Sequence, residues 1–339
     1  MPKHDIDYPR EEGSGARNRN ERICLILNPR AGAGRAGREV GVLERAVDRA
    51  FENWEIRQTE RQGHAAELAQ GAVEDGFDIV AAVGGDGTCN EVVCGLFDGE
   101  RARSRKVVFT VVPFGTGSDL IKSLKIPRAL NESLWVAATG ITLPTDVGSV
   151  TVTTPDGAER RLFINVAGFG INGEVVLRAN RSSKRFGGAI TFFQATAQSL
   201  MSYRPRRVAV EWDGPDGKGE WEGDLTSGFV ANGAYCGGGM WVGKGGSMVD
   251  GCFDLTLLPD ASLGQQLLSA PAMYNGRLDR VSGVVRARAS WVKASASSGA
   301  PVHIDLDGEM PGQLPAEFRV LARALNVRGG WTQNPLLNG

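Results

Sequence analysis

The chain has 339 residues, a formal net charge of −1 at pH 7, 42% hydrophobic residues and 23% charged residues. This composition is ordinary for a soluble globular protein, and the balanced charge excludes a global nucleic-acid-binding footprint. The length is sufficient for two domains, because single domains usually have about 100–200 residues.

The cysteines and the N-terminal residues indicate a cytoplasmic protein. The five cysteines are scattered without a CxxC pair, which favours buried free thiols over a disulfide framework or a zinc site. No apolar run reaches the roughly 18 residues that a membrane-spanning helix needs. Residues 1–20 are polar and charged, with neither a signal peptide nor a membrane span, and are predicted to form a disordered tail.

The first half of the chain alternates strands and helices. Short apolar runs predict strands, and each is followed by apolar residues at helical spacing. This order predicts a doubly wound parallel sheet. The strands are expected over 22–28, 54–60, 78–83 and 106–112, and the helices over 37–50, 63–76, 88–97 and from Ser118 onward.

After about residue 140 the segments alternate apolar and polar residues between Gly, Asp and Pro turns. This pattern predicts an antiparallel β-sandwich-like domain or open barrel. Two helices are expected within it, over 187–203 and over LGQQLLSAPAMYNG (263–276). The predicted organisation is a tail, an α/β domain, a strand-rich domain and a C-terminal segment that could return to the first domain: 1–20, 21–143, 144–325 and 326–339.

Three glycine-rich loops follow three of the predicted parallel strands: NPRAGAG (28–34), GGDGT (84–88) and PFGTG (113–117). The carboxyl ends of parallel strands lie at one edge of a sheet, where ligands bind in such folds. Glycine lets the backbone approach a ligand closely, and free N–H groups at a helix N-terminus bind anions. Three such loops at one edge predict a polyphosphate site.

Asp86 lies between the glycines of the second loop. A carboxylate among phosphate-binding amides is costly unless it orients Mg²⁺ or a nucleophilic hydroxyl. The alternative is that Asp86 caps the following helix, but Thr88 could serve equally as that cap. We therefore favour a functional role for Asp86.

Two further glycine patterns are rejected. GAGRAG (32–37) resembles a dinucleotide fingerprint, but the nearest acidic residue at the end of the second strand, Glu60, lies about 28 positions past Gly32 rather than about 20. GGMWVGKG (238–245) lacks the hydroxyl residue of a P-loop, because Gly245 stands there, and it lies in the strand-rich half.

The ordered motifs NPRAGAG, GGDGTCNEV and PFGTGSDL resemble the diacylglycerol kinase catalytic domain, which bacterial lipid kinases share with sphingosine and ceramide kinases. The resemblance continues through NVAGFGINGEV (165–175), GGGMWVGKGGSMVDGCFDL (237–255) and IDLDGE (304–309). It implies a nucleotide-binding first domain, an active site in the cleft between the domains, and ATP-contacting residues at Asn28, Pro29, Gly32, Thr59, Gly84, Gly85, Asp86, Gly87, Thr88, Asn90 and Thr116.

The resemblance also implies that the general base is Asp307 or Glu309, facing Asp86 across the cleft. A plain β-turn is the alternative for LDGE, since Asp-Gly is common in hairpins. The family has a structural Mg²⁺ loop, which here corresponds to the Asp250 carboxylate and the backbone oxygens of Ser247 and Cys252. Two departures from the family's pattern in this loop, Val249 and Lys244, weaken the expectation of a metal there.

The predicted function is an ATP- and Mg²⁺-dependent kinase that phosphorylates a lipid hydroxyl. The acceptor is left open among diacylglycerol, a sphingoid base, ceramide and phosphatidylglycerol. An NAD kinase and a non-catalytic nucleotide-binding relative are the alternatives. No nucleic acid is expected as a partner, and peripheral contact with a membrane is expected through the basic and aromatic residues of 181–207.

Overall fold

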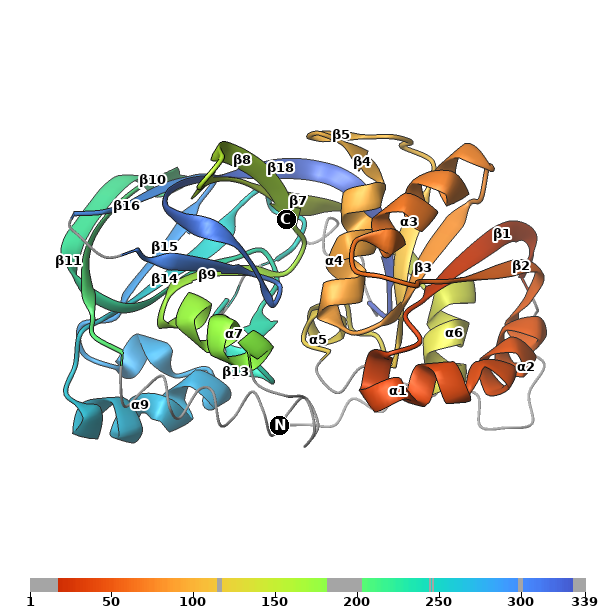
Figure 1. The fold of residues 1–339 in the computed structure, drawn as a ribbon, viewed down its shortest axis with the longest axis horizontal. Coiled ribbons are helices and arrows are strands. Elements are labelled where there is room, and N and C mark those ends of the chain that lie inside the picture. The colour runs from red at the N-terminus through yellow and green to blue at the C-terminus, as the bar shows by residue number, and fades with distance from the viewer. Residues whose placement is uncertain are drawn as a thin grey trace.

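The computed structural model describes residues 18–114, 118–181, 203–243, 245, 247–297 and 301–331. Two halves lie side by side, one with helices packed around a parallel sheet and one built mainly of antiparallel strands (Figure 1). The predicted α/β class of the first half and the antiparallel class of the second half are confirmed.

The first half contains a parallel sheet in the order β2-β1-β3-β6. Every residue of β3 and β6 is buried, as expected for strands that are covered on both faces. The elements are β1 (Asn18–Leu27), α1 (Ala31–Arg38), α2 (Val40–Ala50), β2 (Phe51–Gln58), α3 (His64–Glu74), β3 (Ile79–Gly84), α4 (Asp86–Gly95), β4 (Phe97–Asp98), β5 (Arg101–Ala102), β6 (Val108–Pro113), α5 (Leu120–Ser123) and α6 (Leu130–Thr139).

The strands of the second half pair in a ring that runs β11-β10-β16-β18-β17-β9 and returns to β11. The predicted helix over 263–276 is confirmed as α9, whereas the one over 187–203 falls almost entirely outside the described residues. The elements are β7 (Ile141–Thr154), β8 (Gly157–Phe163), β9 (Val166–Gly170), α7 (Ile171–Arg181), β10 (Arg206–Gly214), β11 (Gly217–Ala231), β12 (Tyr235–Cys236), β13 (Met240–Trp241), β14 (Phe253–Pro259), α9 (Leu263–Asn275), the 3₁₀ helix η2 (Leu278–Arg280), β15 (Val285–Ala289), β16 (Trp291–Ala296), β17 (His303–Leu306) and β18 (Glu309–Gly329).

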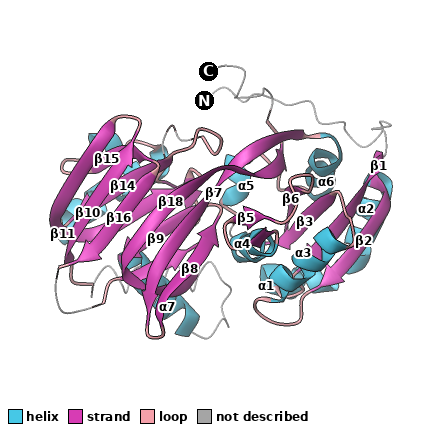
Figure 2. Cartoon of the chain, turned by 90° about the horizontal axis from the view of Figure 1, so that it is seen from above, coloured by secondary structure: helices cyan, strands magenta, loops and turns pink. Residues whose placement is uncertain are grey.

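One strand, β18, belongs to both halves. Its first residues pair with β17 and the next with β16. Most of its length pairs with β7, and its last residues pair in parallel with β6 through Asn326 and Val327 (Figure 2). The register against β7 shifts between Leu321 and Leu325. Arg323 lies in that shift with a φ of 52°.

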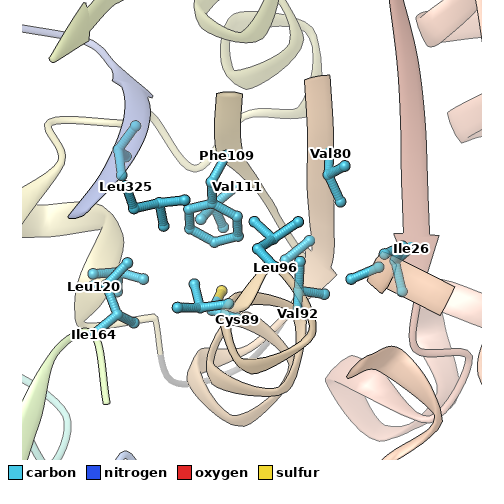
Figure 3. Packing of buried hydrophobic residues seen from close by; sticks show 14 of the residues in the cluster. Ile26, Val80, Cys89, Val92, Leu96, Phe109, Val111, Leu120, Ile164 and Leu325 are labelled. Carbon is cyan, nitrogen blue, oxygen red and sulfur yellow. The ribbon is translucent and has the colours of Figure 1, made fainter. Parts of the chain in front are cut away.

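The core of the first half fixes the helix that follows the GGDGT motif. Val92 of α4 and Leu96, which follows the helix, pack with strand residues such as Val80 and Phe109 and with Leu325 of β18 (Figure 3). All five of these side chains are buried. Because α4 is held by this packing, the loop at its N-terminus has a fixed position at the edge of the sheet.

Among the described residues, no helix combines the length and the apolar character needed to cross a bilayer. All five cysteines are free thiols.

Candidate active site

The loops that follow β1, β3 and β6 contact one another at the carboxyl edge of the parallel sheet. The Asn28 backbone N–H donates to the Val83 carbonyl at 3.1 Å, and the Asn28 side-chain amide donates to Thr88 Oγ1 at 3.1 Å. The Phe114 N–H donates to the Gly84 carbonyl at 3.1 Å. The three motifs that are separate in the sequence therefore share one site.

The first loop has an unusual backbone. Gly32, Ala33 and Gly34 have φ values of 60°, 57° and 81°, so three successive residues are left-handed inside the segment that begins α1. A Cβ atom on Gly32 would lie 2.5 Å from the Phe114 carbonyl oxygen, which excludes any larger residue. Close backbone approach between the first and third loops thus requires a glycine here.

Asp86 is the first residue of α4, and its carboxylate caps a different helix. Oδ2 accepts the Asp119 N–H at 3.0 Å and Oδ1 accepts the Leu120 N–H at 3.1 Å, at the start of α5. The N-terminus of α4 has no side-chain cap at Gly85, and the Thr88 hydroxyl faces Asn28. Burial raises the pKa of Asp86, and the nearby Asp119 carboxylate raises it further.

Asp119 connects this loop to the second half of the chain. Its buried carboxylate accepts the Gly238 N–H at 2.7 Å and pairs with Lys122 Nζ at 2.7 Å. Ser123 also contacts the second half, because its Oγ accepts the Ala234 N–H at 2.9 Å. Sequence reasoning missed this role for Asp119, although the residue lies inside the PFGTGSDL motif.

The DGE motif forms a tight turn between β17 and β18. Asp307 and Gly308 have φ values of 49° and 93°, and the Gly308 N–H donates to Asp305 Oδ1 at 2.8 Å. Asp tolerates the left-handed conformation better than most residues do. The β-turn that the sequence offered as an alternative is therefore present. The Asp307 carboxylate lies within this turn, and Glu309 directly follows it.

The Asp307 carboxylate is bound by the start of β9. It accepts backbone N–H groups from Ile164 at 3.1 Å, Asn165 at 3.3 Å and Val166 at 2.9 Å. The Asn90 amide of the first half, oriented to donate, lies 3.3 Å from Asp307 Oδ2. Burial raises the pKa of Asp307 to about 7, outweighing these hydrogen bonds, and the charge of Asp86 contributes to the rise.

Glu309 forms a further contact between the halves. Its Oε1 accepts the Gln62 side-chain amide at 3.1 Å. Gln62 lies in the loop that follows Thr59, whose N–H donates to the Leu27 carbonyl at 2.9 Å at the end of β1. Asp86, Asn90, Asp307 and Glu309 therefore gather where the two halves meet.

Two family models match this chain. Residues 22–150 match the model of the diacylglycerol kinase catalytic domain, and residues 165–329 match that of the YegS C-terminal NAD kinase beta sandwich-like domain. Residues 22–150 belong to the diacylglycerol kinase catalytic-domain family. The chain is a kinase of the lipid kinase type, and the expected β-sandwich-like class of its second half is confirmed.

Several relatives carry matching names. A diacylglycerol kinase of Bacillus subtilis (strain 168) is 29% identical over 311 residues, covering 91% of this chain and 96% of its own. A diacylglycerol kinase of Staphylococcus aureus (strain MRSA252) is 25% identical over 307 residues, covering 91% and 92%. A crystal structure of a diacylglycerol kinase from Bacillus anthracis str. Sterne has a TM-score of 0.66 at 18% identity, covering 93% and 98%, and at this identity it supports the fold alone.

In the loop expected to hold a structural metal, the Asp250 carboxylate is already bound by other groups of this lipid kinase. Asp250 Oδ1 accepts the Cys252 N–H at 3.0 Å, and Oδ2 pairs with Arg288 Nη2 at 2.7 Å. The guanidinium already neutralises the one carboxylate of the predicted set, so the set of Ser247, Asp250 and Cys252 fits a divalent cation poorly. Within the described ranges, no group of three or more His, Cys, Asp or Glu residues could hold a metal ion.

Three predicted features fall wholly or partly outside the described residues. Thr116 of the third loop and Lys244 of the metal loop are among them, as is most of the basic segment 181–207. Their roles in the lipid kinase stay predictions.

Proposed function

We propose that this chain transfers the γ-phosphate of ATP to a hydroxyl group of a lipid. The observation that carries the proposal is the meeting of two parts: three contacting glycine-rich loops in the first half, and a carboxylate-bearing turn in the second half. Glycine-rich loops at the carboxyl edge of a parallel sheet suit the phosphates of a nucleotide. The residues proposed to bind ATP are Asn28, Pro29, Gly32, Thr59, Gly84, Gly85, Asp86, Gly87, Thr88, Asn90 and Thr116.

Asp86 is proposed to help bind the Mg²⁺ ion that accompanies the nucleotide. Each of its oxygens accepts one backbone N–H, which leaves acceptor capacity on both. Mg²⁺ is commonly bound by one or two carboxylates together with substrate phosphates, so this donor set fits the ion. The bound ion would spread the charge that develops on the transferred phosphoryl group.

The carboxylates of the second half are proposed to act on the acceptor. In phosphoryl transfer the protein positions the reactants and provides a carboxylate that takes the hydroxyl proton. The family resemblance suggests Asp307 or Glu309 for that role. Both belong to the turn that contacts the nucleotide-binding half through Asn90 and Gln62.

The lipid acceptor is proposed from the relatives, which are named diacylglycerol kinases. Diacylglycerol is therefore the first acceptor to test. Peripheral contact with a membrane, through the segment 181–207, follows as a further proposal if the acceptor resides in a bilayer.

The test is transfer of label from γ-labelled ATP, with Mg²⁺, to lipids in mixed micelles. Diacylglycerol, sphingosine, ceramide and phosphatidylglycerol are assayed beside NAD. A labelled lipid is the expected result, and label on NAD alone, or on no acceptor, contradicts the proposal.

Asp86→Asn is the blank in this assay and should nearly abolish transfer. The Asn side chain has a single acceptor oxygen, so it can retain only one of the two N–H groups of Asp119 and Leu120. An unpaired buried N–H costs about 1–3 kcal/mol, so a circular dichroism spectrum should verify that the variant is folded. Asp213→Asn is the matched control, because Asp213 lies near the end of β10 in a weak surface contact with Lys218 at 4.0 Å.

A further inference from the structure

The loop that precedes β14, residues 247–252, is held by the carboxylate of Asp146. Asp146 is a fully buried residue of β7, and its N–H donates to the Met248 carbonyl at 2.7 Å. Its Oδ2 accepts the Gly251 N–H at 2.7 Å, and its Oδ1 accepts the Arg323 N–H at 2.7 Å in the register shift of β18. The 247–252 loop is therefore fixed to β7 and, through the same carboxylate, to β18.

The 247–252 loop also brings a second carboxylate close to Asp146. Burial raises the pKa of Asp146, and the nearby charge of Asp250 contributes to the rise. Two neighbouring carboxylates repel each other unless a cation lies beside them. The family resemblance assigns a structural Mg²⁺ ion to this loop, whereas here Arg288 Nη2 lies 2.7 Å from Asp250 Oδ2. Val249, one of the departures from the family's pattern, is buried and adds no side-chain oxygen to the loop.

Two arginines of β15 bind this part of the chain. β15 is the last strand of the sheet and lies beside β14, with which Arg286 and Arg288 are in register (Figure 2). Residues two apart in a strand point to the same face, so both guanidinium groups extend in one direction. Arg286 Nη2 donates to the Val242 carbonyl at 3.3 Å, and Arg288 pairs with Asp250. The register of β14 against β15 thus places one positive charge at each end of the stretch 242–250.

This stretch is connected to the junction of the halves. The Val242 N–H donates to the Ala234 carbonyl at 3.0 Å, and the Ala234 N–H donates to Ser123 Oγ of α5 at 2.9 Å. α5 is the helix whose first N–H groups are capped by the Asp86 carboxylate. A continuous series of contacts therefore connects the arginines of β15 to the carboxylate that is proposed to bind the nucleotide's Mg²⁺.

We propose, on the basis of the proposed function, that Arg288 takes the structural place of a Mg²⁺ ion in the 247–252 loop and is a positioning residue for the reaction. Arginine stays charged in proteins, and its planar fork matches the geometry of a carboxylate. One guanidinium balances the single charge of Asp250, so the loop is ordered without a metal. Together with Arg286, it fixes the stretch 242–250, and through that stretch it fixes α5 beside Asp86.

A small set of variants separates the charge of Arg288 from the shape of its side chain. Arg288→Lys keeps the positive charge without the fork, and Arg288→Met removes the charge from a side chain of similar reach. The double variant Arg288→Met with Asp250→Asn removes both charges of the pair. Arg319→Met is the matched control, because Arg319 is an exposed residue of β18 that donates to Glu317, two residues away, at 2.6 Å.

The first measurement is the Tm of each nucleotide-free protein in EDTA and in excess Mg²⁺. We expect no difference between the two conditions for the wild type, Arg288→Lys, the control and the double variant. Arg288→Met should have a lower Tm in EDTA, and Mg²⁺ should restore part of it, because the freed Asp250 carboxylate can then bind the ion. If Arg288→Met folds only in Mg²⁺, that result agrees with the proposal as well.

The second measurement is kcat with diacylglycerol in mixed micelles as a function of Mg²⁺. A substitution that acts through intermediate contacts typically changes a rate by about 2–30-fold, so we expect a loss of that size in Arg288→Met at a Mg²⁺ concentration that saturates the wild type. Higher Mg²⁺ should restore the lost kcat, and Arg288→Lys should retain most of it without added Mg²⁺. A general loss of folded protein would lower kcat without this additional Mg²⁺ dependence.

Three results would overturn the assignment. A nucleotide-free wild type or Arg288→Lys protein that Mg²⁺ stabilises shows that a cation, not the side chain, neutralises the loop. An Arg288→Met protein with wild-type Tm and wild-type kcat at every Mg²⁺ concentration shows that Arg288 positions nothing. A wild type that labels no lipid counts against the proposed function and the positioning role, whereas the Tm series needs no kinase activity and decides the replacement of the ion by itself.

Discussion

The contact between α3 and α4 can be tested with a single methyl group. Gly95, the last residue of α4, lies so close to α3 that a Cβ atom there would be 2.1 Å from the Ala66 carbonyl oxygen and 2.8 Å from Ala66 Cα. An ordinary contact begins near 3.4 Å, so Gly95→Ala must separate the two helices by more than about 1 Å. The obstructing atoms are backbone, so no rotamer change can relieve the clash.

The expected loss of stability in Gly95→Ala is the difference between two opposing contributions. Overpacking a well-packed site costs about 1–3 kcal/mol, and a backbone clash belongs at the upper end of that range. Alanine regains up to about 1 kcal/mol over glycine in a helix. The net loss is about 2 kcal/mol, or a fall in Tm of roughly 3 °C for a cooperative chain of this size.

Thermal unfolding by circular dichroism measures this loss, and the KM for ATP should rise as well. α3 begins at His64, directly after the loop that holds Thr59 and Gln62, so its displacement moves a proposed part of the nucleotide site. Gly264→Ala in α9 is the matched control, because nothing lies within 4 Å of the added methyl group, and it should leave Tm unchanged or slightly raised. A Gly95→Ala protein as stable as the wild type would refute the described helix contact.

Two further predictions concern solution conditions. The free energy of unfolding should fall as the pH rises from about 4 to about 7. Burial raises the pKa values of Asp305 and Asp307 to about 7, so the folded protein retains protons that the unfolded chain releases. Urea titrations at several pH values measure this dependence, which Asp305→Asn should flatten and which a rise in stability across this window would contradict. EDTA should leave the Tm of the nucleotide-free protein unchanged, because Arg288 already pairs with Asp250, whereas Arg288→Met should create a protein that Mg²⁺ stabilises. A wild-type Tm that falls in EDTA would show that a cation binds there despite Arg288.

The gathering of the three glycine-rich loops could be predicted from the sequence, because parallel strands end at a common edge. The contacts of Asn28 with Thr88 and of Phe114 with Gly84 agree with that reasoning. Asp86 was singled out as a carboxylate between the glycines of the second loop, but the helix that it caps was not foreseen. Its partners, the N–H groups of Asp119 and Leu120, lie more than thirty residues away in the chain.

The contacts between the halves could not be predicted from local pattern. Asp119 meets Gly238 and Asn90 meets Asp307 across long stretches of sequence, and these pairings depend on how antiparallel strands are ordered. The same holds for Arg288 and Asp250, which the register of β14 against β15 brings together. Periodicity predicts which face of a strand is buried, but it does not determine which strand lies beside it.

The path of β18 has a consequence for how the protein is made. The parallel sheet of the first half is completed by Asn326 and Val327, which pair with β6, and Thr110 Oγ1 donates to the Arg328 carbonyl at 3.0 Å. During synthesis β6 is available about two hundred residues before its neighbour leaves the ribosome, and until then it is an open edge that can pair with other chains. The nucleotide-binding half therefore cannot finish folding before the strand-rich half has been translated, and the first half produced by itself should aggregate.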